Sequence, residues 1–201
     1  MVHRIRSCSE TKLKRLSLLF GRAFFTDPLY EYIFPDLSTR QEAIAWELGN
    51  ILRYGLRFGT LHVDSRLQGC AVWLPPGETD FTEERMSQTG MPKSTEYIDD
   101  EAEKRLMLFI EQTEEVHRRI IAFSHWYLVL LGVEPARQKT GIGSALLQFG
   151  LSKVDEGRFP VYLETTESEN LQFYRKFGFE VQEQSALPGG TELWYLIREN
   201  I

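Results

Sequence analysis

The sequence predicts a single α/β domain with a mixed, twisted central sheet and helices on both faces. The continuous apolar run "SHWYLVLLGV", 124–133, is typical of a strand that is buried on both faces. A helical pattern follows over 140–157, and a second apolar strand follows over 160–166. This order predicts two parallel strands joined by a right-handed crossover. The length of 201 residues fits one domain, 1–201.

The first half of the chain alternates helical and strand patterns. "HRIRSC", 3–8, predicts an opening strand, and apolar residues at helical spacing predict a helix that begins before Leu13. "LYEYIF", 29–34, predicts a short helix that ends at Pro35, and a longer helix is predicted to stop near Gly59. The next two segments, 60–65 and 68–75, predict a hairpin.

The remaining elements follow from composition and periodicity. Residues 75–94 are rich in Pro, Gly, Thr and Glu, which predicts an irregular segment, and 96–120 are charged and helical. A helix over 169–179 is expected to be capped at Gly178, and two further strands are expected over 179–184 and 192–197. We expect an N-terminal half, 1–120, and a C-terminal half, 122–198.

Composition and charge narrow the classes of function. The net charge of −6 argues against a nucleic-acid binder and is compatible with a cationic substrate. The two cysteines and four scattered histidines lack the spacing of a metal site, so no metal is predicted. Apolar runs are too short for a membrane span or a signal peptide, which predicts a cytoplasmic protein without a membrane partner.

The loop before the helix at 140–157 has the features of an anion site. Gly141 and Gly143 let a ligand approach the backbone, and a helix N-terminus offers unpaired N–H groups and partial positive charge. Arg137 and Lys139 add positive charge. The spacing differs from that of a nucleoside-triphosphate loop and of a dinucleotide fingerprint, and a plain helix-starting turn is the alternative.

Gln138-x-x-Gly141-x-Gly143, preceded by "GVEP", resembles the acyl-CoA signature of the GNAT superfamily of N-acetyltransferases. The segment "VYLETTESENLQFYRKFGFEV", 161–181, resembles the second conserved segment of that family. With "PGGTELWYLIR", it is also similar to the puromycin N-acetyltransferase-like branch. The resemblance is firm over 123–198 and looser over "AFFTDPLYEYIFPD" and "CAVWLPPG". Lys139 is a departure, because many members carry glycine there.

The resemblance implies a GNAT-like fold in which the parallel strands splay and form a V-shaped acyl-CoA cleft. It implies acetyl-CoA as co-substrate and direct transfer to a primary amine of a small molecule in a ternary complex. Gly132 indicates a bulge or a close backbone approach, with simple relief of packing as the alternative. The cofactor-binding residues implied are Leu131, Val133, Gln138, Lys139, Thr140, Gly141, Ile142, Gly143, Ser144, Asn170, Phe173, Tyr174 and Arg175. Asn170 is alternatively a helix cap, and Arg175 a solvated surface residue.

Three groups are expected to carry the chemistry. The backbone N–H of Val133 is the candidate donor to the oxyanion, and Tyr174 is the candidate acid for the departing thiolate. Glu164 is the candidate base, with His125 or a water as alternatives. A core aromatic is the alternative role for Tyr174, and a solvated strand-end carboxylate is the alternative for Glu164.

The acceptor side is expected to come from the first half of the chain. The family position suggests that the residues lining it are Phe25, Asp27, Tyr30, Tyr32, Trp73 and Tyr127. Asp27 with Pro28 also fits a helix start, and Trp73 also fits the core. The charged segment 96–120 is expected to be a solvated surface that could wall the acceptor site.

Two other classes of function stay open from the sequence. A non-catalytic acyl-CoA sensor would keep the loop and lack the acid, and an interaction protein would use 96–120 to bind a partner. The identity of the amine acceptor and the oligomeric state, monomer or homodimer, are not predicted.

Overall fold

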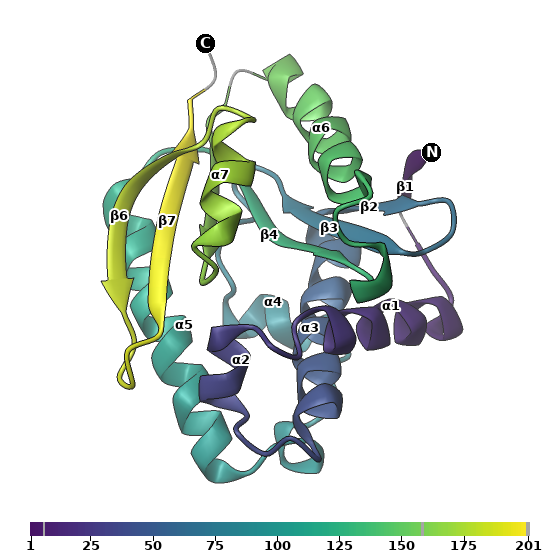
Figure 1. The fold of residues 1–201 in the computed structure, drawn as a ribbon, viewed down its shortest axis with the longest axis vertical. Helices are drawn as coiled ribbons and strands as arrows, with labels where there is room; N and C mark the ends of the chain where they lie inside the picture. The colour runs from purple at the N-terminus through teal and green to yellow at the C-terminus, as the bar shows by residue number, and fades with distance from the viewer. Residues whose placement is uncertain (6, 158, 200–201) are drawn as a thin grey trace.

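The computed structural model describes residues 1–5, 7–157 and 159–199, which form one seven-stranded sheet flanked by helices (Figure 1). The strand order is β1-β2-β3-β4-β5-β7-β6. The strands are β1 (Val2–Ile5), β2 (Thr60–Asp64), β3 (Gly69–Leu74), β4 (Trp126–Val133), β5 (Val161–Thr165), β6 (Glu180–Ala186) and β7 (Glu192–Arg198). The helices are α1 (Glu10–Ala23), α2 (Pro28–Ile33), α3 (Arg40–Phe58), α4 (Glu83–Ser87), α5 (Asp100–Ile120), α6 (Ile142–Val154) and α7 (Glu169–Arg175). Short 3-10 turns are η1 (Ser94–Glu96), η2 (Pro135–Arg137) and η3 (Asp155–Gly157).

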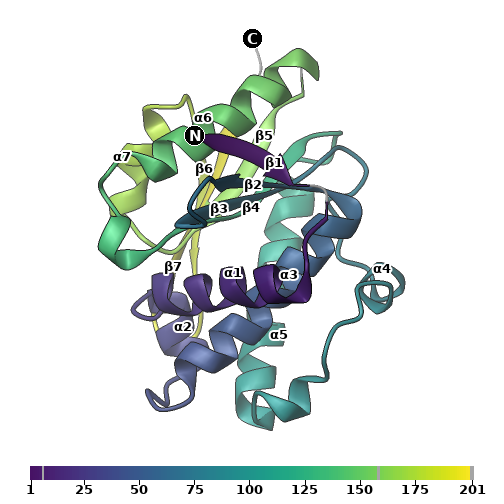
Figure 2. The ribbon, with the colours of Figure 1, turned by 90° about the vertical axis from the view of Figure 1, so that its right-hand side faces the viewer.

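The sheet separates two helical layers, as Figure 2 shows. Helices α6 and α7 cover one face, and α1, α2, α3 and α5 lie on the other. Each face has its own hydrophobic cluster, because side chains alternate between the two faces along each strand. Tyr127 and Tyr162 belong to the cluster on the α1–α3 side, whereas Leu128 and Leu163 belong to the cluster on the α6 side. The predicted fold class, a mixed sheet with helices on both faces, is confirmed.

Strands β4 and β5 are parallel, as predicted, and they pair over a short stretch only. The pairs are Trp126 with Val161 and Tyr127 with Tyr162. Beyond these pairs, β4 continues along β3, whereas β5 continues along β7. The carboxyl-terminal halves of the two strands therefore diverge, and a wedge opens between them in the middle of the sheet.

The bulge that accompanies this divergence lies at Val129. The register between β3 and β4 shifts there, because Val72 pairs with Leu130 and Trp73 pairs with Leu128. Val129 and Leu130 consequently pack against the same cluster. The expectation of a bulge at Gly132 is wrong, because Gly132 pairs regularly with Cys70.

Gly132 is instead a site of close helix packing. A Cβ at this position would lie 2.5 Å from the ring of Phe20 and 3.0 Å from that of Phe24. Since real Cβ atoms do not approach other atoms this closely, any side chain here would push α1 away from β4. The close approach that the sequence indicated is therefore one of a helix to the sheet.

Local capping explains where most elements begin and end. Asp27 caps α2 by accepting a hydrogen bond from the N–H of Leu29 at 2.9 Å, with Pro28 in the first helical turn. Gly59 ends α3, and Gly178, with φ of +84°, follows α7. These boundaries confirm the predicted ones.

The segment 75–98 differs from the prediction in detail. It contains α4, because the hydroxyl of Thr82 caps a helical turn that the composition concealed. The long charged helix begins at Asp100, since Asp99 accepts from the N–H of Ala102 at 2.7 Å. Within the described ranges, no helix has the length and apolarity that crossing a bilayer requires.

Candidate active site

The loop between β4 and α6 holds a run of unpaired backbone donors. Lys139 and Gly141 both take positive φ, 60° and 91°, and Gly141 stands at the N-cap of α6 without a side-chain partner. The N–H groups from Lys139 to Ser144 donate to no group in the described part of the chain. Such a nest of amides at a helix N-terminus is a preformed anion site. These residues fit the diphosphate of an acyl-CoA.

The shape of this loop is fixed by its own polar side chains. Thr140 donates its hydroxyl to the carbonyl of Arg137 at 2.6 Å, and the side-chain amide of Gln138 donates to the carbonyl of Val133 at 3.4 Å. The backbone N–H of Gln138 donates to the carbonyl of Pro135 at 3.2 Å. Gln138 thus differs from its successors, because its backbone N–H and its side-chain amide each donate to a carbonyl, of the loop or of the end of β4.

A bidentate ion pair ties the start of the loop to α1. Nε of Arg22 donates to Oε1 of Glu134, and Nη2 of Arg22 donates to Oε2, each at 2.8 Å. This fork geometry restricts orientation as well as distance. The beginning of the anion-binding loop is therefore held against the helix that packs beneath β4.

The end of β4 presents backbone groups to the wedge. The N–H of Glu134 donates to the carbonyl of Gln68 at 2.8 Å, so these two residues form a hydrogen-bonded pair. Pairs alternate along an antiparallel ladder, so the peptide groups of Leu131 and Val133 point away from β3. They face the side on which β5 has diverged. This orientation supports the expectation that Leu131 and Val133 offer backbone groups to a ligand.

Gly143 brings α6, β4 and α7 together. A Cβ there would lie 3.7 Å from Val133 and 3.9 Å from Phe173.

Asn170 on α7 donates its side-chain amide to the hydroxyl of Thr165 at 3.4 Å. The N-cap of α7 is Ser168, so Asn170 is not the cap. Arg175 is exposed on the same helix.

Tyr174 lies on the α6–α7 side of the sheet and is 8% exposed. Its ring packs edge-on against Phe173 and Phe179, which fixes the direction of the phenol. Burial raises the pKa of Tyr174 above its usual value, and the charges of Glu164 and Asp27 raise it further. The phenol is therefore a neutral proton donor near a carboxylate.

Glu164 points to the opposite side of the sheet and accepts a hydrogen bond from the hydroxyl of Tyr127. Its second oxygen, Oε2, is buried and has no partner in the described residues. Burial raises the pKa of Glu164 to about 7, and the hydrogen bond from Tyr127 opposes that rise. Burial raises the pKa of Tyr162, and the charge of the adjacent Glu164 raises it further.

A second carboxyl with a raised pKa, the half-buried Glu47 on α3, was missed from the sequence. The hydroxyl of Tyr30 donates to its Oε2 at 2.8 Å, and burial raises the pKa of Glu47 to about 7. The signal was present, because Glu47 stands between Ile44 and Ile51 on the apolar face of the predicted helix. A charged residue on such a face needs a partner.

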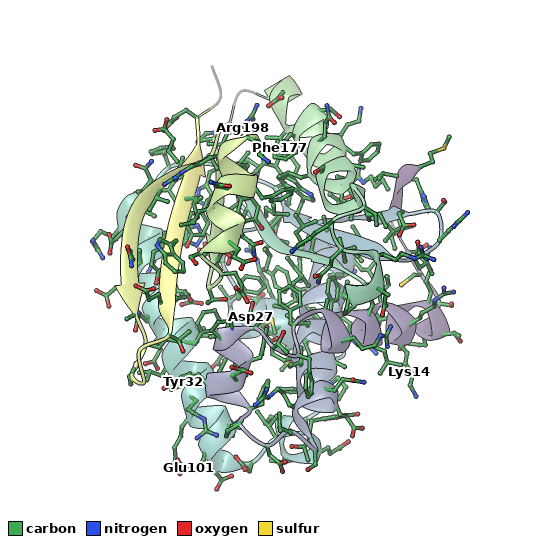
Figure 3. The ribbon with its side chains drawn as sticks, viewed as in Figure 1. Lys14, Asp27, Tyr32, Glu101, Phe177 and Arg198 are labelled. Carbon is green, nitrogen blue, oxygen red and sulfur yellow. The ribbon has the colours of Figure 1, made fainter. Side chains whose placement is uncertain are left out.

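Asp27 completes this side of the site. Its Oδ1 accepts from the hydroxyl of Thr166, just after β5, at 2.7 Å, and burial raises its pKa. In Figure 3, Asp27 lies near the middle of the molecule, whereas Tyr32 lies toward its edge. We name the following residues the carboxylate–tyrosine cluster: Asp27, Tyr30, Glu47, Tyr127, Tyr162 and Glu164.

Three residues predicted to line the acceptor side make the following contacts. Trp73 is fully buried against Gly150 of α6, in the cluster on the other face from Tyr127, so the structure does not bring it to this site. Phe25 lies under the guanidinium of Arg40, 5.3 Å from Cζ to the ring centroid. Tyr32 lies near Gly189 in the β6–β7 turn.

His125 stands at the start of β4 with both ring nitrogens in use. Nδ1 lies 2.6 Å from the carbonyl oxygen of Phe123, and Nε2 lies 2.7 Å from Nε2 of His117. Burial lowers the pKa of both histidines, that of His117 to about 3. This environment disfavours His125 as the base. The described residues contain no group of three or more metal-ligating side chains.

Comparisons with known proteins give a matching family model and a curated relative. Residues 103–181 match the family model described as acetyltransferase (GNAT) domain. An N-acetyltransferase of Schizosaccharomyces pombe, described as uncharacterized, is 27% identical over 195 residues, which cover 93% of this chain and 74% of that protein.

Solved structures share the fold over the whole chain. A Corynebacterium glutamicum protein described as histone acetyltransferase HPA2 and related acetyltransferase has a TM-score of 0.64 at 20% identity, covering 100% of this chain and 97% of that one. Arylalkylamine N-acetyltransferase 2 of Aedes aegypti has a TM-score of 0.61 at 13% identity, covering 100% and 99%. Residues 103–181 are thus similar to a GNAT acetyltransferase domain, and the whole chain shares the fold of the solved structures.

Proposed function

We propose that this domain transfers the acetyl group of acetyl-CoA to a primary amine of a small molecule, directly and within a ternary complex. One observation carries the proposal. The unpaired amides from Lys139 to Ser144 and the Tyr127–Glu164 pair lie on opposite sides of the sheet, and the wedge between β4 and β5 separates them. A phosphate-bearing donor bound on one side can therefore reach an amine bound on the other.

Glu164 is the proposed base. A primary amine with a pKa of ~10.4 is protonated at neutral pH, and removing that proton costs roughly 4–5 kcal/mol. A carboxyl whose pKa is about 7 is divided between its two forms at neutral pH. The free Oε2 of Glu164 supplies an acceptor for the amine proton. Tyr127 holds the other oxygen and fixes the orientation of the carboxyl.

Val133 and Tyr174 are proposed to act on the thioester. The N–H of Val133 points into the wedge, where it can donate to the carbonyl oxygen as negative charge develops. Tyr174 keeps its proton at neutral pH, because its pKa is raised. It can donate that proton to the departing thiolate.

Direct transfer is favoured over a covalent acyl-enzyme. Cys70 is fully buried and its pKa is raised by burial, so its thiolate is scarce. Cys8 lies before α1, and burial raises its pKa as well. Neither cysteine is part of the carboxylate–tyrosine cluster.

The three carboxyl groups of the carboxylate–tyrosine cluster support a cationic acceptor. Asp27, Glu47 and Glu164 form no ion pair with a lysine or arginine in the described ranges. A buried carboxylate is costly without a counter-charge, and an ammonium group supplies one. The name of the Aedes aegypti relative also specifies an amine acceptor.

Three further properties stay predictions: membership of the puromycin N-acetyltransferase-like branch, a cytoplasmic location, and a monomeric or homodimeric state. The non-catalytic sensor is the second candidate, and the presence of Tyr174 and of a base with a free oxygen weighs against it.

Release of free thiol from acetyl-CoA in the presence of a panel of primary amines tests the proposal. We expect release that depends on both the amine and the enzyme, with mass spectrometry showing one added acetyl group on the amine. Tight binding of acetyl-CoA without release for any amine would favour the sensor. Absence of acetyl-CoA binding would overturn the assignment of the loop.

A further inference from the structure

Helix α5 reaches the proposed base through one imidazole ring. His117, in the last turn of this helix, is 9% exposed. Its ring stacks on that of Tyr162, with 4.0 Å between centroids and 4° between planes, and it lies edge-on to Tyr127 at 5.1 Å. The rings of Tyr127 and Tyr162 are themselves 5.1 Å apart. The three rings therefore form a closed triangle, in which one ring cannot turn far without displacing the other two.

The two phenols of this triangle lie beside Glu164. Tyr127 donates its hydroxyl to Glu164, and Tyr162 pairs with Tyr127 at the last pair before β4 and β5 diverge. Burial raises the pKa of Glu164 to about 7, and the hydroxyls of Tyr127 and Tyr162 both oppose that rise. The direction in which these hydroxyls point therefore sets both the orientation and the basicity of the carboxyl.

His117 is fixed in turn by a second histidine. Nδ1 of His125 lies 2.6 Å from the carbonyl oxygen of Phe123, which carries no proton, so this nitrogen is the donor. In the neutral ring, Nε2 of His125 is then the acceptor, and Nε2 of His117, 2.7 Å away, donates to it. Burial lowers the pKa of both histidines, so both rings are neutral near pH 7. One tautomer of each ring satisfies both contacts.

These contacts form an ordered series from the backbone to the base. The carbonyl of Phe123 orients His125, and His125 orients the ring of His117. That ring orients the two phenols by stacking and edge contact. An aliphatic side chain would fill the same space without the cost of burying polar nitrogens. What the imidazole adds is a directed hydrogen bond, which gives the ring an orientation that packing alone leaves free.

We propose that His117, oriented by His125, is a positioning residue for acetyl transfer: its ring keeps Tyr127 and Tyr162 in the orientation in which they support Glu164 as the base. This inference rests on the proposed function, and it assigns a role to a residue that acts through the two tyrosines. It also brings the C-terminal end of α5 into the site.

Removing the ring frees the two phenols. A hydroxyl that no longer points at Glu164 stops opposing the effect of burial, so the pKa of the carboxyl rises. The net worth of one hydrogen bond corresponds to a shift of about 0.5–1 pH unit. The rising limb of kcat/KM should therefore move to higher pH. From this shift alone, kcat/KM at pH 7 should fall about 2- to 5-fold.

The experiment measures kcat/KM by thiol release between pH 5.5 and about 9 in the wild type, His117→Leu and His117→Phe. Leucine removes the flat ring, whereas phenylalanine keeps it and loses the hydrogen bond to His125. We expect the limb to move up by about 0.5–1 pH unit in His117→Leu and by less in His117→Phe, which can still stack on Tyr162. Neither histidine has a pKa above 6.5 in the folded protein, so a limb near pH 7 reports on Glu164.

Leu106→Ala is the matched control for lost packing. Leu106 is buried in the same helix, roughly 16 Å earlier along its axis. The variant should lower the free energy of unfolding and keep the limb of the wild type. An unchanged limb in His117→Leu, or turnover by the wild type without a limb near pH 7, would overturn the inference and leave acetyl transfer standing. No turnover by the wild type with any amine would overturn both proposals.

Nitrogen-15 spectra of the histidine side chains test the geometry in the wild-type protein, without any variant. At pH 7 we expect two neutral rings of opposite tautomer, with Nδ1–H in His125 and Nε2–H in His117. The same tautomer in both rings, or a charged ring, would mean that His125 does not orient His117. That result would overturn the inference whether or not the variants fold.

Discussion

The hydroxyl of Tyr127 on β4 donates to the carboxyl of Glu164 on β5, just beyond the point where these parallel strands stop pairing. The bond crosses the opening of the wedge. It occupies one carboxylate oxygen, and among the described residues no group forms a hydrogen bond with the buried Oε2. A carboxyl with one oxygen fixed and one free, and with its pKa raised to about 7, is suited to accept a proton near neutral pH.

The first prediction concerns the pH dependence of acetyl transfer. Because Glu164 must be ionised to act as a base, kcat/KM should rise with pH through about 7 in the wild type. In Glu164→Gln we expect kcat/KM to be lower by about 100-fold or more, and the rising limb near pH 7 to be lost. Thiol-release kinetics between pH 5.5 and about 9 check both points.

Glu169→Gln is the control, since Glu169 is exposed in the first turn of α7 and lies close in sequence. It should leave the pH profile unchanged. A wild-type limb that persists in Glu164→Gln would assign the base to another group or to a water.

The second prediction concerns Tyr174. Tyr174→Phe removes the proton donor and keeps the ring that packs against Phe173 and Phe179. We expect kcat to fall about 100-fold, while calorimetry gives the same affinity for acetyl-CoA. Phe173→Leu should instead weaken binding of the cofactor. Unchanged kcat in Tyr174→Phe, where chemistry limits the rate, would remove the acid role.

The third prediction links Glu164 to stability. Its pKa is about 7 in the folded protein and 4.5 as its ordinary value, so the folded state holds the proton more tightly. The resulting stabilisation is full below pH 4.5 and is lost as the pH rises through about 7. Between pH 5 and 8, this carboxyl should lower the free energy of unfolding by about 2–3 kcal/mol.

Urea unfolding of wild type and Glu164→Gln at both pH values tests this sign. Glu47, His62, His117 and His125 have shifted pKa values in both proteins, so their effects cancel in the difference. We expect the glutamine variant to lose less stability on going from pH 5 to 8. An equal loss in the two proteins would mean that Glu164 titrates at its ordinary pKa.

Local patterns in the sequence predict the elements and part of the site. The sequence predicts the anion-binding loop around Gly141, because small residues at a helix start leave the first backbone N–H groups accessible. The roles of Glu164 and Tyr174 are predicted from their positions, at the end of an apolar strand and on the next helix, together with the resemblance. These inferences need only neighbours along the chain.

What the sequence misses depends on distant partners. Glu47 meets Tyr30 only because α2 packs on α3, and periodicity gives the face of a helix without naming what lies opposite. Strand alternation leaves the face of Trp73 open until Gly150 of α6 makes room for its ring. Gly132 indicated a bulge or a close approach without saying which: its missing side chain makes room for Phe20, and the bulge lies at Val129.

The last prediction separates backbone strain from cofactor binding. Gly141 has a φ of +91°, where an L side chain costs about 1–2 kcal/mol, and no atom lies within 4 Å of a Cβ placed there. Gly90 has a φ of +68° and equally open surroundings, far along the chain in the segment before α5. Alanine at either site should lower the unfolding free energy by a similar amount. Only Gly141→Ala should also weaken acetyl-CoA binding, about tenfold or more, because it shifts the amides of the anion site. Equal affinity in the two variants, measured by calorimetry, would place the diphosphate elsewhere.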